Sequence, residues 1–243
     1  DGEEMDHESH IYLNYQLIRK RLAAWLDSGI RPGKILVALG MLEMVFIELK
    51  EGVDDPQIIF ESINSTGLAL SNADLIRNFR LMSDRDQERL YEEYWVPIEK
   101  ALKHGTNYSN LNLFFVQYIV YRTNAPVTEG NLYVRFVKLF HAQGYTHESC
   151  LQELKYFAEI FKSFVYDGDD YPAMVTKYLR GIRLTKKTTA YPFLLHVFDD
   201  YAKNVMDAKT LGQVVQLVFI YLLRRSVCGV PSNSLRGFFT YLY

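Results

Sequence analysis

The sequence predicts a mainly α-helical protein with one short strand near its N-terminus. Apolar residues recur at helical spacing through most of the 243 residues, and glycine, proline and asparagine separate these segments. Hydrophobic residues make up 49% and charged residues 23%, which is typical of a globular chain and excludes disorder of the whole chain. The aromatic content of 14% indicates bulky packing between helices.

The first elements are two helices and the strand. Residues 12–26 have apolar side chains near helical spacing, and Gly29 and Pro32 end that helix. A short apolar helix is expected over residues 34–39. Residues 44–49, Met-Val-Phe-Ile-Glu-Leu, predict a strand. Because one strand cannot form a sheet alone, its partners are expected in a segment outside this chain.

Two helices flank a polar loop. Pro56 stands at the first turn of a helix over about 57–63, where its missing N–H costs nothing. The second helix covers residues 71–82. Ser71 is its expected N-cap, and Asp74 three residues later makes a variant of the capping box.

The rest of the chain predicts helices only. Their expected ranges are 84–103, 111–122, 128–143, 147–164, 172–180, 191–203 and 209–225. The net charge changes sign between residues 1–100 and residues 101–243. The first part has 11 Lys and Arg against 19 Asp and Glu, and the second has 16 against 10. Opposite charges indicate different partners or mutual attraction.

A basic stretch lies in the second part. No acidic residue occurs between Tyr171 and Phe198. Five cations stand there: Lys177, Arg180, Arg183, Lys186 and Lys187. They are the DNA-binding candidates, since clustered cations contact phosphates. The alternative is an ordinary solvated helix face.

Cysteine usage and hydropathy predict a cytoplasmic protein without membrane contact. Cys150 and Cys228 cannot build a disulfide framework. The apolar stretches 111–121 and 214–223 are too short for a membrane span. The acidic start lacks both an initiating Met and a basic leader, which indicates a fragment of a longer protein.

The polar loop and the helix after it form the main motif. Its residues are Phe60, Glu61, Asn64, Ser65, Thr66, Gly67, Ser71, Asp74, Arg77 and Asn78. Hydroxyls and free N–H groups at the helix start can face a phosphate. Asp74 and Arg77 share a helix face and can pair. The alternative is a helix–loop–helix junction that Asn64 and Ser71 hold by capping.

This motif resembles that of the bacterial GmrSD-type restriction family. The matching pattern is Phe60-Glu61-x-x-Asn64-x-x-Gly67-x-x-Leu70-Ser71, followed by Asp74-Leu75-x-x-Asn78. Two later runs also match: Tyr94-Trp95-x-Pro97-Ile98-Glu99, and Leu222-Leu223-Arg224-Arg225-x-x-Cys228-Gly229-x-Pro231-x-Asn233. The resemblance covers about residues 40–240.

The resemblance implies two domains with different roles. Residues 1–100 would be the C-terminal part of a ParB-like α/β core, and residues 101–243 the helical domain after it. The family's Asp-Gly-Gln-Gln-Arg motif, linked to nucleotide hydrolysis, and its HNH-type nuclease half are not in this sequence. The chain would thus act in phage defence as a DNA-sensing, nucleotide-coupled scaffold. No cofactor is expected within it. The nucleotide triphosphate and Mg²⁺ would belong to the parent protein, whose N-terminal and nuclease segments would be its partners.

Two other functions stay open. Glu48 and Lys50 end the predicted strand and match half of the Asp…Glu-x-Lys pattern of metal-dependent nucleases, with Asp27 as the upstream carboxylate. The catalytic loops of common nucleotide-binding and hydrolytic enzymes are absent from the sequence. A helical protein–protein adapter without a nucleic-acid role is the third hypothesis. No metal site is expected, because His141, His147 and Cys150 lack a zinc spacing.

Overall fold

The structure, a computed structural model of the whole chain, describes residues 10–43, 46, 48, 70–81, 86–103, 109–231 and 235–242. These residues are mainly helical and include no strand, which confirms the predicted fold class in its broad form. Phe46 and Glu48, from the predicted strand, lie outside any helix or strand. An isolated strand has no neighbour for its backbone hydrogen bonds. The helix expected over 57–63 lies outside the described residues.

The chain divides into two compact units, Asp1–Lys50 and Glu51–Tyr243. The first contains α1 (His10–Asp27) and α2 (Pro32–Gly40), close to their predicted ranges. Gly29 ends α1 with a φ of 88°, a left-handed conformation that glycine adopts without strain.

The second unit begins with helices that pack against later ones. They are α4 (Asn72–Leu81), α5 (Gln87–Leu90), a π-helical turn (Tyr91–Trp95) and α6 (Val96–Leu102). Helix α4 packs on α8 and α6 packs on α9, so these helices belong to the same compact unit as the later ones. The predicted division of the parent protein's domains at residue 100 stays a prediction.

The middle of this unit is formed by α7 (Ser109–Thr123), α8 (Leu132–Gln143) and α9 (His147–Val165). A 3₁₀ turn, Glu129–Asn131, precedes α8. Gly144 ends α8 at a φ of 65°, and Thr146 caps α9 through a capping box with Ser149. All three helices match their predictions to within a few residues.

The last helices are α10 (Ala173–Leu184), α11 (Tyr191–Ala202), α12 (Ala208–Val227) and α13 (Leu235–Tyr241). A 3₁₀ turn, Thr188–Ala190, precedes α11. The sequence did not predict α13, and α10 runs four residues beyond its predicted end at Arg180. Gly181 lies inside the helix, where a Cβ would be 2.5 Å from the Phe219 ring of α12. The missing side chain therefore lets α12 approach closely.

Helices α10 and α12 are parallel, and the residues in contact between them keep a constant separation in the sequence. Gly212 lies against Met174, Gln216 donates a 2.9 Å hydrogen bond to the Tyr178 hydroxyl, and Phe219 lies against Gly181. Each of these pairs is 38 residues apart in the sequence. The C-terminal ends of the two helices therefore lie at the same end of the pair.

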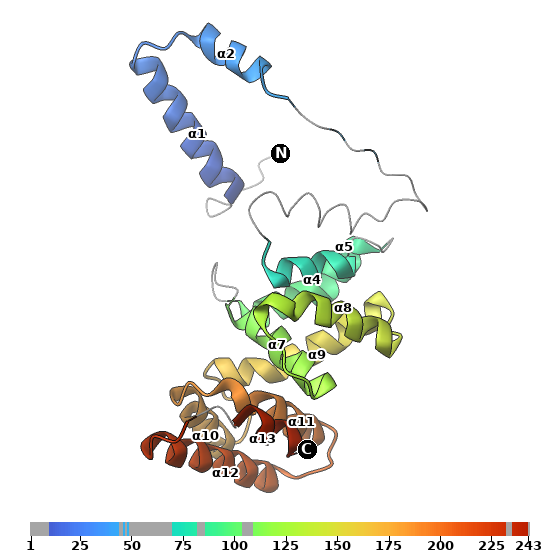
Figure 1. Cartoon of the computed structure of the whole chain (residues 1–243). Coiled ribbons are helices and arrows are strands. Elements are labelled where there is room, and N and C mark those ends of the chain that lie inside the picture. The colour runs from blue at the N-terminus through green and yellow to red at the C-terminus, as the bar shows by residue number, and fades with distance from the viewer. Residues whose placement is uncertain are drawn as a thin grey trace. The chain divides into compact units, whose positions relative to one another are not determined.

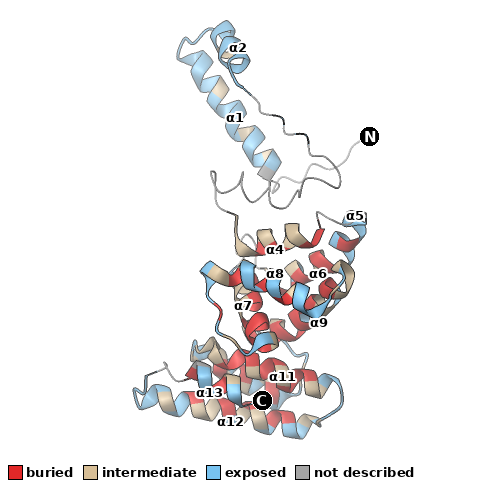
Figure 2. Cartoon of the chain, turned by 45° about the vertical axis from the view of Figure 1, so that its right-hand side comes forward, coloured by how far each residue is buried: buried red, intermediate tan, exposed pale blue. Residues whose placement is uncertain are grey.

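The core of the second unit is aromatic. Helices α7 and α9 lie between α4, α6 and α8 on one side and α10 to α13 on the other (Figure 1). Buried residues gather where these helices face one another (Figure 2). Phe161 of α9 is fully buried, and its ring contacts Phe114, Phe164 and Tyr191 at centroid distances of 5.4 to 5.6 Å. One ring cluster therefore joins α7, α9 and α11.

Candidate functional site

The described half of the motif forms a helix cap. The Ser71 hydroxyl donates a 2.6 Å hydrogen bond to Asp74 and accepts the Asp74 backbone N–H at 3.2 Å. The Ser71 N–H donates in turn to the Asp74 carboxylate at 3.3 Å. This reciprocal arrangement confirms the predicted capping box.

The predicted pair of Asp74 and Arg77 also forms, with a nitrogen–oxygen distance of 3.2 Å. Arg77 also lies 3.8 Å from Glu99 of α6, so it connects the two helices. Asn78 is half-buried on α4. These contacts favour a structural role for Ser71, Asp74 and Arg77. The other motif residues, Phe60, Glu61, Asn64, Ser65, Thr66 and Gly67, lie outside the described residues.

The nuclease candidates do not form a described site. Glu48 is exposed and outside any strand, which is a correction to the predicted strand end. Lys50 lies outside the described residues. Among the described residues, no group of three His, Cys, Asp or Glu side chains is placed to hold a metal ion. In the described ranges, no helix has both the length and the apolarity needed to span a bilayer.

The five basic candidates separate into two groups. Lys177 and Arg180 are exposed on α10 and share a hollow of about 620 Å³ with Asp167 and Asp169. Arg183 pairs with Asp167 and donates a 2.9 Å hydrogen bond to the Ser163 carbonyl. Carboxylates therefore partly offset these three cations.

The second group stands at the end of α10. Lys186 is exposed in the turn after the helix, and Lys187 is half-buried beside it. Because α10 and α12 are parallel, this turn and the last turn of α12 with Arg224 and Arg225 lie at the same end of the helix pair. We call Lys186, Lys187, Arg224 and Arg225 the basic end. The described α10 and α12 contain no acidic residue, so no carboxylate of these two helices offsets it.

A second feature was not predicted from the sequence. A groove of about 760 Å³ lies beside α9. Its other walls include Asp170 and Tyr171, which precede α10, and Tyr201 and Ala202 at the end of α11. Four tyrosines line it together with carboxylates. We call it the aromatic groove and define it by Tyr94, Tyr156, Tyr171, Tyr201, Glu159 and Asp170.

A buried carboxylate fixes one wall of the groove. Asp199 is 7% exposed and accepts a hydrogen bond from the Tyr156 hydroxyl at 2.9 Å. It also accepts from the Tyr121 hydroxyl at 3.4 Å and from Lys203 at 2.7 Å. The Asp199 carboxylate is therefore paired within the protein, and its hydrogen bond fixes the position of the Tyr156 ring.

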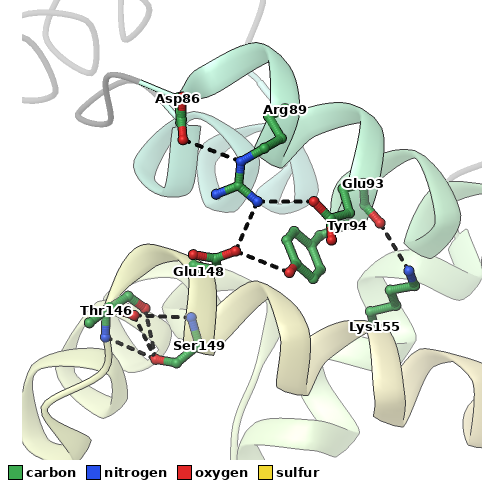
Figure 3. A network of polar contacts seen from close by, with 8 residues as sticks. All are labelled: Asp86, Arg89, Glu93, Tyr94, Thr146, Glu148, Ser149 and Lys155. Carbon is green, nitrogen blue, oxygen red and sulfur yellow. Dashed lines mark hydrogen bonds and ion pairs between the residues drawn. The ribbon is translucent and has the colours of Figure 1, made fainter.

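An ion-pair network lies beside the groove (Figure 3). Arg89 contacts Asp86 at 3.2 Å, Glu93 at 2.9 Å and Glu148 at 2.9 Å. The Tyr94 hydroxyl donates to Glu148 at 3.1 Å. The network joins the π-helical turn to α9 and occupies the carboxylate of Glu93.

Among the described residues, Lys155 is the one cation that lines the groove, and it donates to a backbone carbonyl. The Lys155 ammonium donates to the Glu93 carbonyl at 3.0 Å (Figure 3). In a regular helix the N–H four residues later would donate to that carbonyl, but residue 97 is proline and has none. Pro97 therefore cannot donate to this carbonyl, and the Lys155 ammonium does.

Buried acidic groups predict that the fold weakens in alkali. Burial raises the pKa of Cys150, Tyr171 and Tyr191 to about 12, above the values of 9.0 and 10.0 for free side chains. The unfolded chain therefore loses these protons first. The stabilisation is complete below about pH 9 and is lost as the pH rises toward 12, by roughly 1 kcal/mol per pH unit for each group.

Arg80 acts in the opposite direction, because burial lowers its pKa to about 10. Arg80 is a single group, whereas Cys150, Tyr171 and Tyr191 all lower the stability as the pH rises, so we expect a net loss of stability in alkali. Denaturant unfolding at pH values of about 8 and about 11 tests the prediction. We expect a lower midpoint at the higher pH, and equal midpoints would contradict it.

Comparison with other proteins gives no further assignment. No family model, no curated protein and no solved structure matches this chain. The resemblance to the GmrSD-type family therefore stays a prediction that rests on the motif residues quoted above.

Proposed function

We propose that this chain is a DNA-contacting helical scaffold of a cytoplasmic restriction protein of the GmrSD type. Its first hundred residues would include the end of a ParB-like core. Nucleotide and Mg²⁺ would act on other segments of the parent protein. In this proposal the basic end contacts duplex phosphates, and the helical core relays the contact to the nuclease segment.

The charge of the α10–α12 pair is the observation that carries the proposal. Residues 171–231 contain nine Lys and Arg and three Asp. Asp199 is buried and paired with Lys203, and Asp207 caps α12 by accepting the Thr210 N–H at 2.7 Å. With two of the three carboxylates used this way, this surface presents mainly positive charge, which attracts phosphate.

Reversing two exposed charges of the basic end tests the proposal. For Lys186→Glu/Arg224→Glu we expect the affinity for a short DNA duplex to fall at least about tenfold at low salt, because two phosphate contacts become repulsive. Fluorescence anisotropy with a labelled duplex measures this. The matched control is Arg135→Glu/Lys138→Glu on α8, which makes the same charge change at exposed positions far along the chain. Equal losses in both variants would leave the basic end without a specific role.

A second function is supported by an apolar groove. Phe193, Leu217, Tyr221, Phe238 and Leu242 are among the residues that line a hollow of about 420 Å³ between α11, α12 and α13. Leu217 is 67% exposed. An exposed apolar surface of this kind favours a helical protein–protein adapter. A chain that binds no duplex at low salt but captures a protein partner, and loses it on Leu217→Asp, would favour the adapter.

A further inference from the structure

The aromatic groove carries two carboxylates without partners. Within the described part of the chain, neither Glu159 nor Asp170 has an ion pair or a hydrogen bond. Both line the same hollow as Tyr171, and after burial they contribute with Tyr201 to the raised pKa of the Tyr171 hydroxyl. Two carboxylates without ion pairs therefore share the groove with the Tyr171 ring.

The chain's own cations offset the carboxylates of the groove only in part. Lys155 donates to the Glu93 carbonyl, and Lys203 pairs with Asp199. Arg183 pairs with Asp167 on the neighbouring side of the 167–170 loop. The Glu93 carbonyl is neutral, so Lys155 keeps its positive charge, and the two unpaired carboxylates exceed it by one negative charge.

The rings of the groove are fixed before any ligand arrives. Tyr171 packs edge-to-face on the buried Phe198 with centroids 4.8 Å apart, and its ring lies 6.1 Å from Tyr201. Tyr156 is held by its hydrogen bond to Asp199. A planar guanidinium group stacks on such rings while its N–H groups reach carboxylates.

We propose that the aromatic groove binds an arginine-bearing segment of a partner polypeptide. A volume of about 760 Å³ is larger than one side chain, so a short stretch of peptide fits it. Duplex DNA is disfavoured here, because its phosphates would meet Glu159 and Asp170. This site is separate from the basic end, and its test does not depend on DNA binding.

Binding of a labelled hexa-arginine peptide to the full chain tests the proposal. For Glu159→Gln/Asp170→Asn we expect the affinity to fall about tenfold, because both charge partners are lost. The control Glu88→Gln/Glu92→Gln makes the same charge change at exposed positions that do not line the groove. We expect less than about a twofold change in this control.

A third variant separates stacking from bulk charge. Tyr171→Leu keeps both carboxylates, and we expect it to weaken hexa-arginine more than hexa-lysine, since arginine stacks on the ring. Circular dichroism melts check that each variant folds, and Tyr156→Leu replaces Tyr171→Leu if that variant unfolds. Equal losses in the groove and control variants, or equal effects on both peptides, would overturn the proposal. Self-association or duplex binding that depends on Glu159 and Asp170, without peptide binding, would overturn it too.

Discussion

Replacing Phe161 by alanine is expected to lower the free energy of unfolding by about 3–5 kcal/mol. The Phe161 ring is fully buried and contacts rings from α7 and α11 as well as from its own helix. Its removal takes apolar surface out of the core and leaves a cavity between α7, α9 and α11, which these packed helices fill only in part by relaxing. A loss of this size is a large part of the stability of an ordinary domain.

Guanidinium unfolding followed by circular dichroism measures the effect. The matched control is Phe238→Ala, the same chemical change at a side chain of α13 that is 41% exposed. We expect the control to cost about 1 kcal/mol or less. Similar losses for the two variants would mean that the ring cluster does not hold the second unit together.

The second large effect is expected at Arg80, and its sign depends on the replacement. Arg80 is fully buried, with its guanidinium carbon 3.7 Å from the Phe79 ring centroid and 3.4 Å from that of Phe140. None of its three side-chain nitrogens has a hydrogen-bond partner of good geometry among the described residues, and its polar neighbours include the Cys150 thiol, a weak acceptor. Burial lowers its pKa to about 10. The two rings offset only part of the cost of removing this charge from water.

Methionine at position 80 keeps the length of the side chain and removes the charge. We expect Arg80→Met to match or exceed the wild-type stability, by up to about 3 kcal/mol, while Arg80→Ala loses about 2–4 kcal/mol through its cavity. The same unfolding assay compares them. If Arg80→Met were as unstable as Arg80→Ala, the guanidinium itself would be needed in the core.

Helix positions were predictable because their signals are local. Apolar spacing predicted α7, α8 and α9, and the structure places Gly144 at the end of α8 and Thr146 at the start of α9. The errors arose where packing overrides local preference. Glycine often ends a helix, but Gly181 lies inside α10, where it makes room for Phe219 of α12, a helix far away in the sequence. The predicted strand at 44–49 had the right residue types but no neighbouring strand among the described residues.

The motif and the groove show the same contrast. Ser71, Asp74 and Arg77 lie within seven residues of one another, so their contacts followed from helical spacing. The aromatic groove joins residues from Tyr94 to Ala202, and only the fold brings them together. One local signal existed, since Gln152, Tyr156 and Glu159 share one face of α9. Tyrosine on a helix face is common, however, so this signal alone does not define a site.

The distribution of charge was predicted only in part. The five basic candidates lie within eleven residues of the sequence. Arg183, however, forms an ion pair with Asp167, and Lys177 and Arg180 share a hollow with aspartates. The parallel packing of α10 and α12 places Arg224 and Arg225 at the same end as the remaining lysines. Such a grouping depends on helix packing, which the sequence pattern does not contain.

The salt dependence of DNA binding tests the central proposal most directly. Affinity of the full chain for a labelled duplex is measured from about 50 to about 200 mM salt. Four cations at the basic end predict a slope of log affinity against log salt of about −3 to −4, since each phosphate contact contributes about −0.9. The slope should become shallower in Lys186→Glu/Arg224→Glu and stay unchanged in Arg135→Glu/Lys138→Glu. No measurable binding at low salt, or one slope for all three proteins, would contradict a DNA-contacting role for this chain.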